Sequence, residues 1–323
     1  SNRVNLKCVK CNNIINKDLS DGRWKNIYCY SCYGVGKVSY EEKNILSYVK
    51  TFEFEINENY RLFDNKHKEV DIFVPNMNLS IEYNGSSWHS FGSTFPNNLK
   101  LEHDAKFKHI EKTNWCLNLG VRLLHVCSTE WQSNIKREIW KSIINNIFDK
   151  SIKIEENLCE IVNIDLDECN LFLNKNSLSG ICKSEIIIGL LYKNALISIM
   201  SFTKLINKKY EWRLDRFCTL NGYFIIGGAI KLFEFFKNNF IPNTIIGYSD
   251  LRYSNGQYYK DMGFVYNGIT DISYRYVKNH NSIIKHNAKL HLTKKSTHII
   301  DFSKSIDFNM INNNYRRLWN CGY

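Results

Sequence analysis

Apolar and polar residues alternate with a period of two over residues 69–74 and again over residues 79–84. This period is typical of half-buried β-strands, and the short segment between them, which begins with Pro75, has the composition of a turn. In a hairpin of these two strands, Asp71 and Glu82 lie on the same side. The pattern therefore predicts that their carboxylates converge.

A helix is predicted before this hairpin. Ser39 has the place of an N-cap, Glu41 and Glu42 follow in the first turn, and apolar residues continue at helical spacing to about residue 50. Acidic residues at this position commonly serve only the helix dipole. A further role for Glu42 needs more than its position.

A second helix is predicted over residues 103–119, ending at Gly120, with a buried strand over residues 121–127. His109 and Lys112 are three residues apart and therefore share one face of this helix. The predicted order of elements is helix, strand, strand, helix, strand.

The pattern changes after residue 148. Residues 149–168 are acidic and apolar, which we interpret as a linker. A hairpin is predicted over residues 185–191 and 195–202, and a strand over residues 212–219. Gly227 and its neighbours then open an amphipathic helix. The remaining predicted elements are a strand at 244–248, a short helix at 257–262 and a strand from residue 264 onward.

This second half resembles the GNAT acyltransferase fold. In that family a glycine-containing loop at a helix N-terminus holds the pyrophosphate of acetyl-CoA. Phe224 stands where the family has an amide or basic side chain, before Gly227-Gly228-Ala229. A retained fold with a DNA-binding or specificity role is the preferred interpretation, and acyl-CoA binding is the alternative.

Composition supports a folded protein with a polyanionic partner. The chain has 323 residues, of which 44% are hydrophobic, and a formal net charge of +11. This charge favours nucleic acid as a partner, although an ordinary basic surface has the same effect. No membrane-spanning run and no signal peptide stand out, so a cytoplasmic location is expected, inside a bacterial host cell if the gene belongs to a phage.

Four of the eleven cysteines form two C-x2-C pairs separated by 17 residues, and the other seven stand singly. The four are Cys8, Cys11, Cys29 and Cys32. This spacing suits a tetrahedral structural Zn²⁺ with four thiolate ligands and no open position for catalysis. A redox-active pair is the alternative.

Several motifs together resemble a known nuclease family. The D-x10-E-x-N spacing of Asp71, Glu82 and Asn84 is similar to the PD-(D/E)XK nuclease pattern, with Asn in the usual place of Lys. The continuation Gly85 and Trp88-His89 resembles the very short patch repair (Vsr-like) branch, and especially the phage homing endonucleases built on it. Further matching elements are Glu42, His109 with Lys112-Thr113, residues 120–125 and Glu130-Trp131. The resemblance covers about residues 1–148.

The resemblance implies a catalytic metal. Asp71 and Glu82, with the carbonyl of Tyr83, would ligate Mg²⁺ or Mn²⁺, since hard cations prefer oxygen ligands. Glu42 would support this site. His89 would act as general acid or base in place of the missing lysine.

The resemblance also assigns His109 and Lys112 to the phosphate or the leaving group. A buried structural histidine and a solvated lysine are the ordinary alternatives. Basic and tyrosine residues alternate in the second half, which suits either DNA contact or an ordinary surface. The arginines concerned are Arg213, Arg216, Arg252 and Arg275.

The predicted architecture is α/β (α+β) in three parts: a zinc ribbon over residues 1–36, a Vsr-like PD-(D/E)XK nuclease domain over 37–148, and a mixed-sheet GNAT-like domain over 149–323. The predicted function is metal-dependent, site-specific cleavage of double-stranded DNA by a homing endonuclease of a phage or mobile element. With one active site, such an enzyme either dimerises on DNA or cuts the strands in sequence. The alternatives are a repair-type nicking endonuclease, a DNA-binding protein that does not cut, and an acyltransferase.

Overall fold

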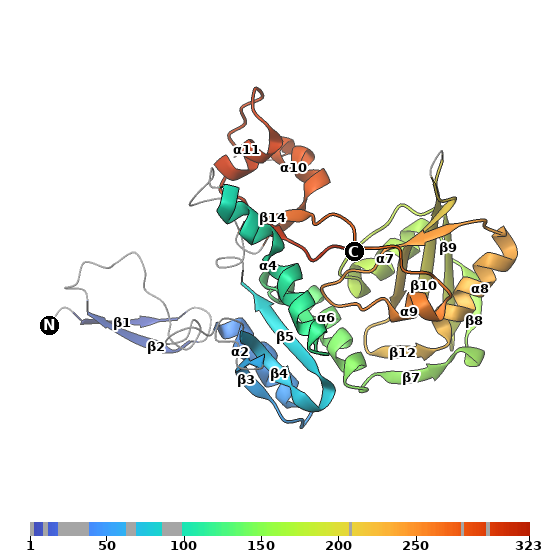
Figure 1. The fold of residues 1–323 in the computed structure, drawn as a ribbon, viewed down its shortest axis with the longest axis horizontal. Helices are drawn as coiled ribbons and strands as arrows, with labels where there is room; N and C mark the ends of the chain where they lie inside the picture. The colour runs from blue at the N-terminus through green and yellow to red at the C-terminus, as the bar shows by residue number, and fades with distance from the viewer. Residues whose placement is uncertain are drawn as a thin grey trace. The chain divides into compact units, whose positions relative to one another are not determined.

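The computed structural model describes residues 3–8, 12–18, 39–62, 69–85, 99–206, 209–278, 281–294 and 298–323. The chain is a mixed α/β protein, as predicted. Its internal contacts divide it into two units, Ser1–Tyr83 and Asn84–Tyr323. Figure 1 shows the elements of each unit.

The first unit begins with an antiparallel hairpin of β1 (Arg3–Lys7) and β2 (Ile14–Asp18). Cys8 opens the turn: its N–H donates to the carbonyl of Asn13, and its carbonyl accepts from the N–H of Asn12, both at 2.9 Å. Asn12 has a φ of 61°, a left-handed conformation that asparagine tolerates better than most residues. The first C-x2-C pair therefore starts in a tight turn.

Helix α2 (Tyr40–Lys50) confirms the first predicted helix. Ser39 Oγ accepts a hydrogen bond from Glu42 N–H at 3.1 Å, and Glu42 Oε2 accepts one from Ser39 N–H at 3.4 Å. This reciprocal capping box satisfies two donors that the helix itself leaves unpaired. Ile45 and Val49 are fully buried.

Strands β4 (Glu69–Val74) and β5 (Leu79–Asn84) pair antiparallel and have the predicted bounds. A 3-10 turn, Pro75–Met77, joins them and ends at Asn78 in the left-handed region. Strand β3 (Asn57–Arg61), which pairs with β4, was not predicted. Its residues are polar and mostly exposed, so they carry no apolar alternation.

The second unit begins with two long helices. It contains α4 (Leu99–Asn118), β6 (Arg122–Cys127), α5 (Ser128–Trp131) and α6 (Asn134–Ile147). Helix α4 starts four residues earlier than predicted and stops, as predicted, before Gly120, whose φ is 71°. Helix α6 was not predicted, although Ser133 caps it and Trp140 and Ile144 are fully buried beneath it.

A five-stranded sheet forms the centre of this unit. Its members are β8 (Glu160–Asn163), β9 (Ile186–Tyr192), β10 (Ala195–Lys204), β11 (Trp212–Thr219) and β13 (Ile245–Gly247). The order is β13-β11-β10-β9-β8, and only β13 runs parallel to its neighbour. Helix α8 (Gly228–Phe240) makes the crossover from β11 to β13 and packs on the sheet, where Phe236 stacks on Phe202 at 3.6 Å between ring centroids.

The predicted linker is wrong. Residues 149–176 form β7 (Ile152–Glu155), which pairs with β12 (Tyr223–Ile226), then β8 and then α7 (Leu166–Asn176). Half of the acidic residues that suggested a linker, from Asp165 to Glu168, belong to the start of α7: Asp165 caps the helix, and its Oδ1 accepts from Glu168 N–H at 2.8 Å. An acidic first turn favours a helix start over a linker because it complements the helix dipole.

The C-terminal part confirms the short helix α9 (Gln257–Asp261) but not a strand from residue 264. Val265 and Tyr266 lie in an irregular, exposed segment, and the strand begins only at Tyr274. The remaining elements are β14 (Tyr274–Lys278), which pairs with β15 (Asn281–Ile284) and β16 (Arg316–Trp319), and the helices α10 (Ala288–Lys294) and α11 (Ile306–Asn312).

Hydrogen bonds between distant segments hold the second unit together. The N–H of His125 on β6 donates to the carbonyl of Arg252 at 2.8 Å, and Arg122 Nη2 donates to the carbonyl of Tyr253 at 2.6 Å. The latter part of the predicted nuclease domain thus shares one compact unit with the predicted C-terminal domain. None of the helices in the described residues combines the length and apolar character needed to cross a membrane.

Candidate functional site

Asp71 and Glu82 lie on adjacent strands of the first unit. The register pairs Ile72 with Ile81, and its continuation by one residue sets Asp71 opposite Glu82. Directly opposite residues of an antiparallel pair present their side chains on the same face. Tyr83 N–H donates to Asp71 Oδ2 at 2.7 Å, so the Asp71 side chain leans across onto β5.

Glu82 is a buried carboxylate, with only 5% of its surface exposed. Burial of a carboxylate in an apolar sheet is costly unless cations or hydrogen-bond donors compensate it. Its strand neighbours Leu79 and Ile81 are almost fully buried as well. On its own face of β5, Glu82 is flanked by Ser80 and Asn84, which are also buried, so it belongs to a row of buried polar side chains.

Glu42 is in electrostatic reach of Glu82. Burial raises the pKa of the Glu42 carboxyl, the Ser39 hydrogen bond opposes this shift, and the negative charge of Glu82 raises the pKa further, with smaller effects from Glu58 and Glu69. The helix-start acid and the strand acid thus repel each other, which is an arrangement that a bound cation relieves.

The donor set suits a hard divalent cation. The first unit provides two carboxylates on adjacent strands, with the backbone carbonyl of Tyr83 beside them, and oxygen ligands of this kind bind Mg²⁺ or Mn²⁺. In the described part of the chain, no three or more His, Cys, Asp or Glu side chains are close enough together to hold a metal by themselves. A site built from the described residues alone would therefore need backbone or water oxygens as well.

Several predicted residues lie outside the described residues. These are His89, the neighbouring Trp88, and three of the four zinc-ligand cysteines, Cys11, Cys29 and Cys32. Their roles stay predictions. Cys8 is described and lies in the turn between β1 and β2.

His109 is buried in the second unit, with 4% of its surface exposed. Its Nδ1–H donates to the carbonyl of Trp319 at 3.0 Å, since a carbonyl can only accept. Burial lowers the pKa of His109 to about 4, and the Trp319 hydrogen bond only partly opposes that shift. His109 is thus neutral at pH 7. Lys112, three residues later on α4, is half-buried.

A polar cluster that sequence reasoning did not assign surrounds His109. The His109 and His125 rings stack at 5.4 Å. His125 Nδ1 lies 3.1 Å from Asn84 Nδ2, which donates to it, and His125 Nε2 therefore carries the proton and donates to Thr113 Oγ1 at 2.8 Å. Asn84, Thr113 and His125 all stand in the matched motifs, but only their distant pairing shows that they act as one cluster.

The Glu130-Trp131 motif contributes to a buried ion network. Arg252 Nη1 donates to both oxygens of Glu130 at 2.9 and 3.0 Å, and Arg252 Nη2 donates to Asp250 at 2.8 Å. Arg275 Nη1 also lies 3.3 Å from Glu130. Burial alone would raise the pKa of Glu130, but the charges of Arg252 and Arg275 outweigh it and lower the pKa.

The four arginines that suggested DNA contact have internal partners. Arg252 and Arg275 bind Glu130, and Arg213 pairs with Asp215. Arg216 donates to the carbonyls of Gly180 and Ile181. Arg252 is buried by its pairing, whereas Arg213 keeps 42% of its side chain exposed beside Asp215.

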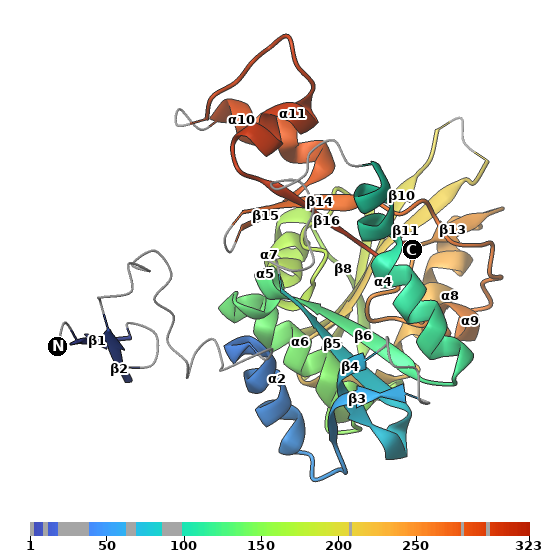
Figure 2. The same ribbon diagram turned by 60° about the vertical axis from the view of Figure 1, so that its left-hand side comes forward.

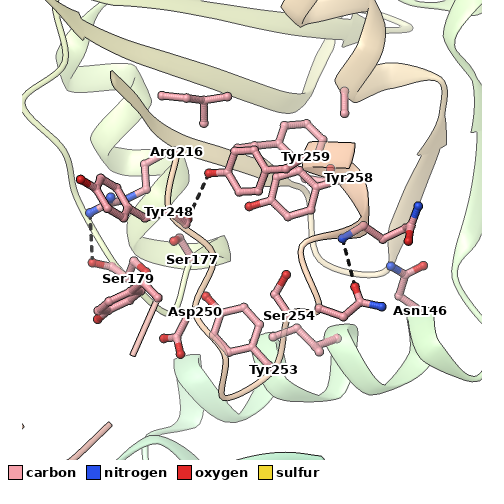
Figure 3. A pocket seen from close by; sticks show the side chains of 18 of the residues that line it. Asn146, Ser177, Ser179, Arg216, Tyr248, Asp250, Tyr253, Ser254, Tyr258 and Tyr259 are labelled. Atoms are coloured by element: carbon pink, nitrogen blue, oxygen red, sulfur yellow. Dashed lines mark hydrogen bonds between the residues drawn. The ribbon is translucent and has the colours of Figure 1, made fainter. Parts of the chain in front are cut away.

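A cavity of about 1200 Å³ lies where β11 and β13 separate. The two strands pair only from Trp212 to Leu214, after which β11 continues and the chain after Gly247 turns away. Figure 3 shows its wall of tyrosine, serine and other polar side chains around an open centre, including Tyr248, Tyr253 and Tyr258. Sequence reasoning did not predict this cavity.

The N-terminus of α8 lines the same cavity. Gly227 caps the helix with a φ of 76°, a conformation that favours glycine. A Cβ at Gly228 would come within 2.7 Å of the Ile225 side chain, so that position also requires glycine. The predicted Gly-Gly motif is thus explained by backbone geometry, with or without a ligand.

Comparisons with protein-family models and with curated proteins find no match for this chain.

Proposed function

We propose that this protein is a metal-dependent endonuclease that hydrolyses phosphodiester bonds in double-stranded DNA. The observation that carries the proposal is the pairing of Asp71 and the buried Glu82 across β4 and β5, within the electrostatic reach of Glu42. The like charges of Glu42 and Glu82 repel each other, and a bound cation would relieve this repulsion. A divalent cation is the ligand that best matches them.

Asp71, Glu82 and the Tyr83 carbonyl would hold the cation. When bound, it would polarise the scissile phosphate and lower the pKa of a water. The Tyr83 N–H fixes the orientation of the Asp71 carboxylate in advance. Glu42 adds negative charge without leaving its helix cap. The proposed acid–base role of His89 and the phosphate roles of His109 and Lys112 stay predictions.

The first test is plasmid cleavage with Mg²⁺ or Mn²⁺, comparing the wild type with Glu82→Gln. The matched control is Glu55→Gln, an exposed glutamate in the same unit. We expect cutting that EDTA stops, that Glu82→Gln abolishes and that Glu55→Gln retains. Equal cutting by all three proteins would refute the site.

We also propose a structural Zn²⁺ bound by Cys8, Cys11, Cys29 and Cys32. The turn that begins at Cys8 supports this, because a tight hairpin turn lets two cysteines three residues apart reach one ion. Cys8→Ser should lose zinc, measured by elemental analysis. The control, Cys159→Ser, changes one of the buried cysteines of the second unit and should keep the zinc. Full zinc content in Cys8→Ser would contradict the ribbon.

A second candidate function, acyl transfer, is favoured by the cavity. Antiparallel β8 to β11, the crossover helix α8 and the parallel, diverging β13 resemble the GNAT arrangement. The N–H groups at the start of α8 would face a pyrophosphate there. Calorimetric titration with acetyl-CoA tests this. A titration without heat of binding would refute the acyltransferase alternative, and only the similarity of fold to the GNAT family would then be left.

Within the nuclease proposal, a homing role suits the architecture better than mismatch repair. A small cleavage site accompanied by further DNA-contacting modules can read a long target in parts. Relaxed cutting at any mismatch, measured on matched and mismatched duplexes, would favour the repair-type nickase instead.

A further inference from the structure

Two buried asparagines fix the loop that precedes α11. Asn313 Nδ2 donates to the Ile299 carbonyl at 2.7 Å, and Asn313 Oδ1 accepts from Ile299 N–H at 3.0 Å. Asn309 binds the backbone of Asp301 in the same way, at 2.9 and 2.7 Å. Each amide thus binds both backbone groups of one residue. The loop is held in one conformation from Ile299 to Asp301.

This fixed loop displays large apolar side chains to solvent. Phe302 is 87% exposed and Ile299 is 73% exposed, while Ile306 and Phe308 at the start of α11 are more than 40% exposed. Between them, Ile300 packs inward on the small core around Met310 and Tyr315. One exposed apolar residue is ordinary, but several on one short segment are typical of a binding surface.

The surroundings of this loop are strongly basic. Residues 281–317 contain five lysines and two arginines against two aspartates and no glutamate. Lys285, Lys289 and Lys304 are exposed. In both views, α10 and α11 lie beside each other at the end of the second unit, beyond β14 and away from the five-stranded sheet (Figure 2).

We infer that the loop of residues 299–304, with α10 and α11, is a DNA-binding surface. Phe302 acts as an apolar wedge against a base step, and Lys289 and Lys304 contact phosphates. Apolar side chains beside lysines are the combination by which proteins kink and hold duplexes. The inference rests on the proposed DNA substrate and is independent of the cleavage chemistry.

The charge argues against a second copy of this chain as the partner. A symmetric contact through this surface would set lysines against lysines, which costs free energy. The polyanionic backbone of DNA instead neutralises the same lysines. DNA also offers base steps that an exposed aromatic ring can enter.

The test is binding of the full-length chain to a fluorescein-labelled duplex of about 30 bp and mixed sequence, followed by anisotropy in EDTA between about 50 and 200 mM salt. Phe302→Ala should weaken binding about tenfold and leave the salt dependence unchanged, because no cation is lost. Lys304→Ala should reduce the slope of log K against log salt by about 0.9, because one phosphate contact is lost.

Two variants serve as matched controls. Tyr266→Ala removes an aromatic ring that is 73% exposed outside this surface, and Lys183→Ala removes an exposed lysine elsewhere in the same unit. Both should bind as the wild type does. Phe302→Trp should retain binding, which separates loss of the ring from loss of the fold. Phe302→Ala itself should melt as the wild type does, because the side chain is exposed.

The outcomes separate this inference from the proposed function. If the wild type cuts DNA and Phe302→Ala binds as tightly as Tyr266→Ala does, the inference is wrong and the nuclease stands. If nothing cuts but binding depends on Phe302, the nuclease proposal fails and the surface stands. If Phe302→Ala instead converts a dimer to a monomer in sedimentation without weakening DNA binding, the surface joins copies of the chain and the inference is overturned.

Discussion

Asp71 Oδ2 accepts a 2.7 Å hydrogen bond from the backbone N–H of Tyr83, across β4 and β5. The bond fixes the orientation of a carboxylate that the register sets opposite Glu82. The Tyr83 N–H thus orients Asp71, and in the proposed site the Tyr83 carbonyl would be a further ligand to the cation.

Asp71→Ala should reduce cleavage by at least about 100-fold while DNA affinity changes little, because it removes a metal ligand and not a phosphate contact. Plasmid cleavage and anisotropy, measured on the same preparation, check this. The matched control is Glu69→Ala, an acid two residues earlier on the same strand. Parallel loss of cleavage and binding in Asp71→Ala would contradict its assigned role.

Glu42→Gln should make the fold more stable at pH 7 and the enzyme less active. The pKa of Glu42 is raised in the folded state, so folding favours its protonated form. Its contribution to the free energy of unfolding is therefore fully present below the ordinary pKa of 4.5 and is lost as the pH rises through the raised value. Gln removes the charge and still completes the capping box with Ser39. Urea unfolding from pH 4 to 8 tests this. Glu42→Gln and the wild type should differ more as the pH rises, and a constant difference would disprove the shift.

His109→Asn should remove the fall in the free energy of unfolding that the wild type shows between pH 6.5 and about 4. The pKa of His109 falls from 6.5 to about 4 on folding, so its contribution is present above pH 6.5 and is lost as the pH falls toward 4. The full loss amounts to about 3 kcal/mol. Asn keeps an N–H donor for the Trp319 carbonyl and does not titrate. Thermal unfolding of both proteins at pH 4.5 and 7.5 measures the difference, with the exposed His103→Asn as control.

Arg252→Met should destabilise the second unit by about 3–5 kcal/mol, because it leaves Glu130 and Asp250 buried with too little compensating charge. Arg137→Met, at a half-buried position on α6 with a single local hydrogen bond to Asn134, should change the free energy of unfolding by less than about 1 kcal/mol. Chemical denaturation compares the two. If Arg252→Met changed the free energy of unfolding as little as the control does, water rather than Arg252 would have to compensate the buried charge of Glu130.

The local pattern was sufficient for elements whose own residues carry a strong period or cap. β4 and β5 alternate strictly and have the predicted bounds, and α2 begins at the predicted Ser39 cap. The hairpin of β9 and β10 turns at Lys193 and Asn194, where both residues have positive φ as a tight hairpin requires. These features depend on interactions within a few residues, so they can be predicted from the local sequence.

Elements with weak local signals were missed or misplaced. β3 is polar, β8 and α7 lie in an acidic stretch that suggested a linker, and β14 begins ten residues after the predicted strand. The strands among them depend on pairing with other segments: β14, for example, pairs with β16 about forty residues later.

The sequence by itself determined that Asp71 and Glu82 share a face, because their spacing on two alternating strands fixes which side chains lie together. Only the tertiary structure decided which groups the other candidates contact. His109 meets Trp319 across 210 residues, and Arg252 meets Glu130 across 122. The physical reason is that burial and ion pairing depend on neighbours in space. The spacing of apolar residues along the chain predicts helices and strands, but it does not predict which distant residue will bury a given side chain.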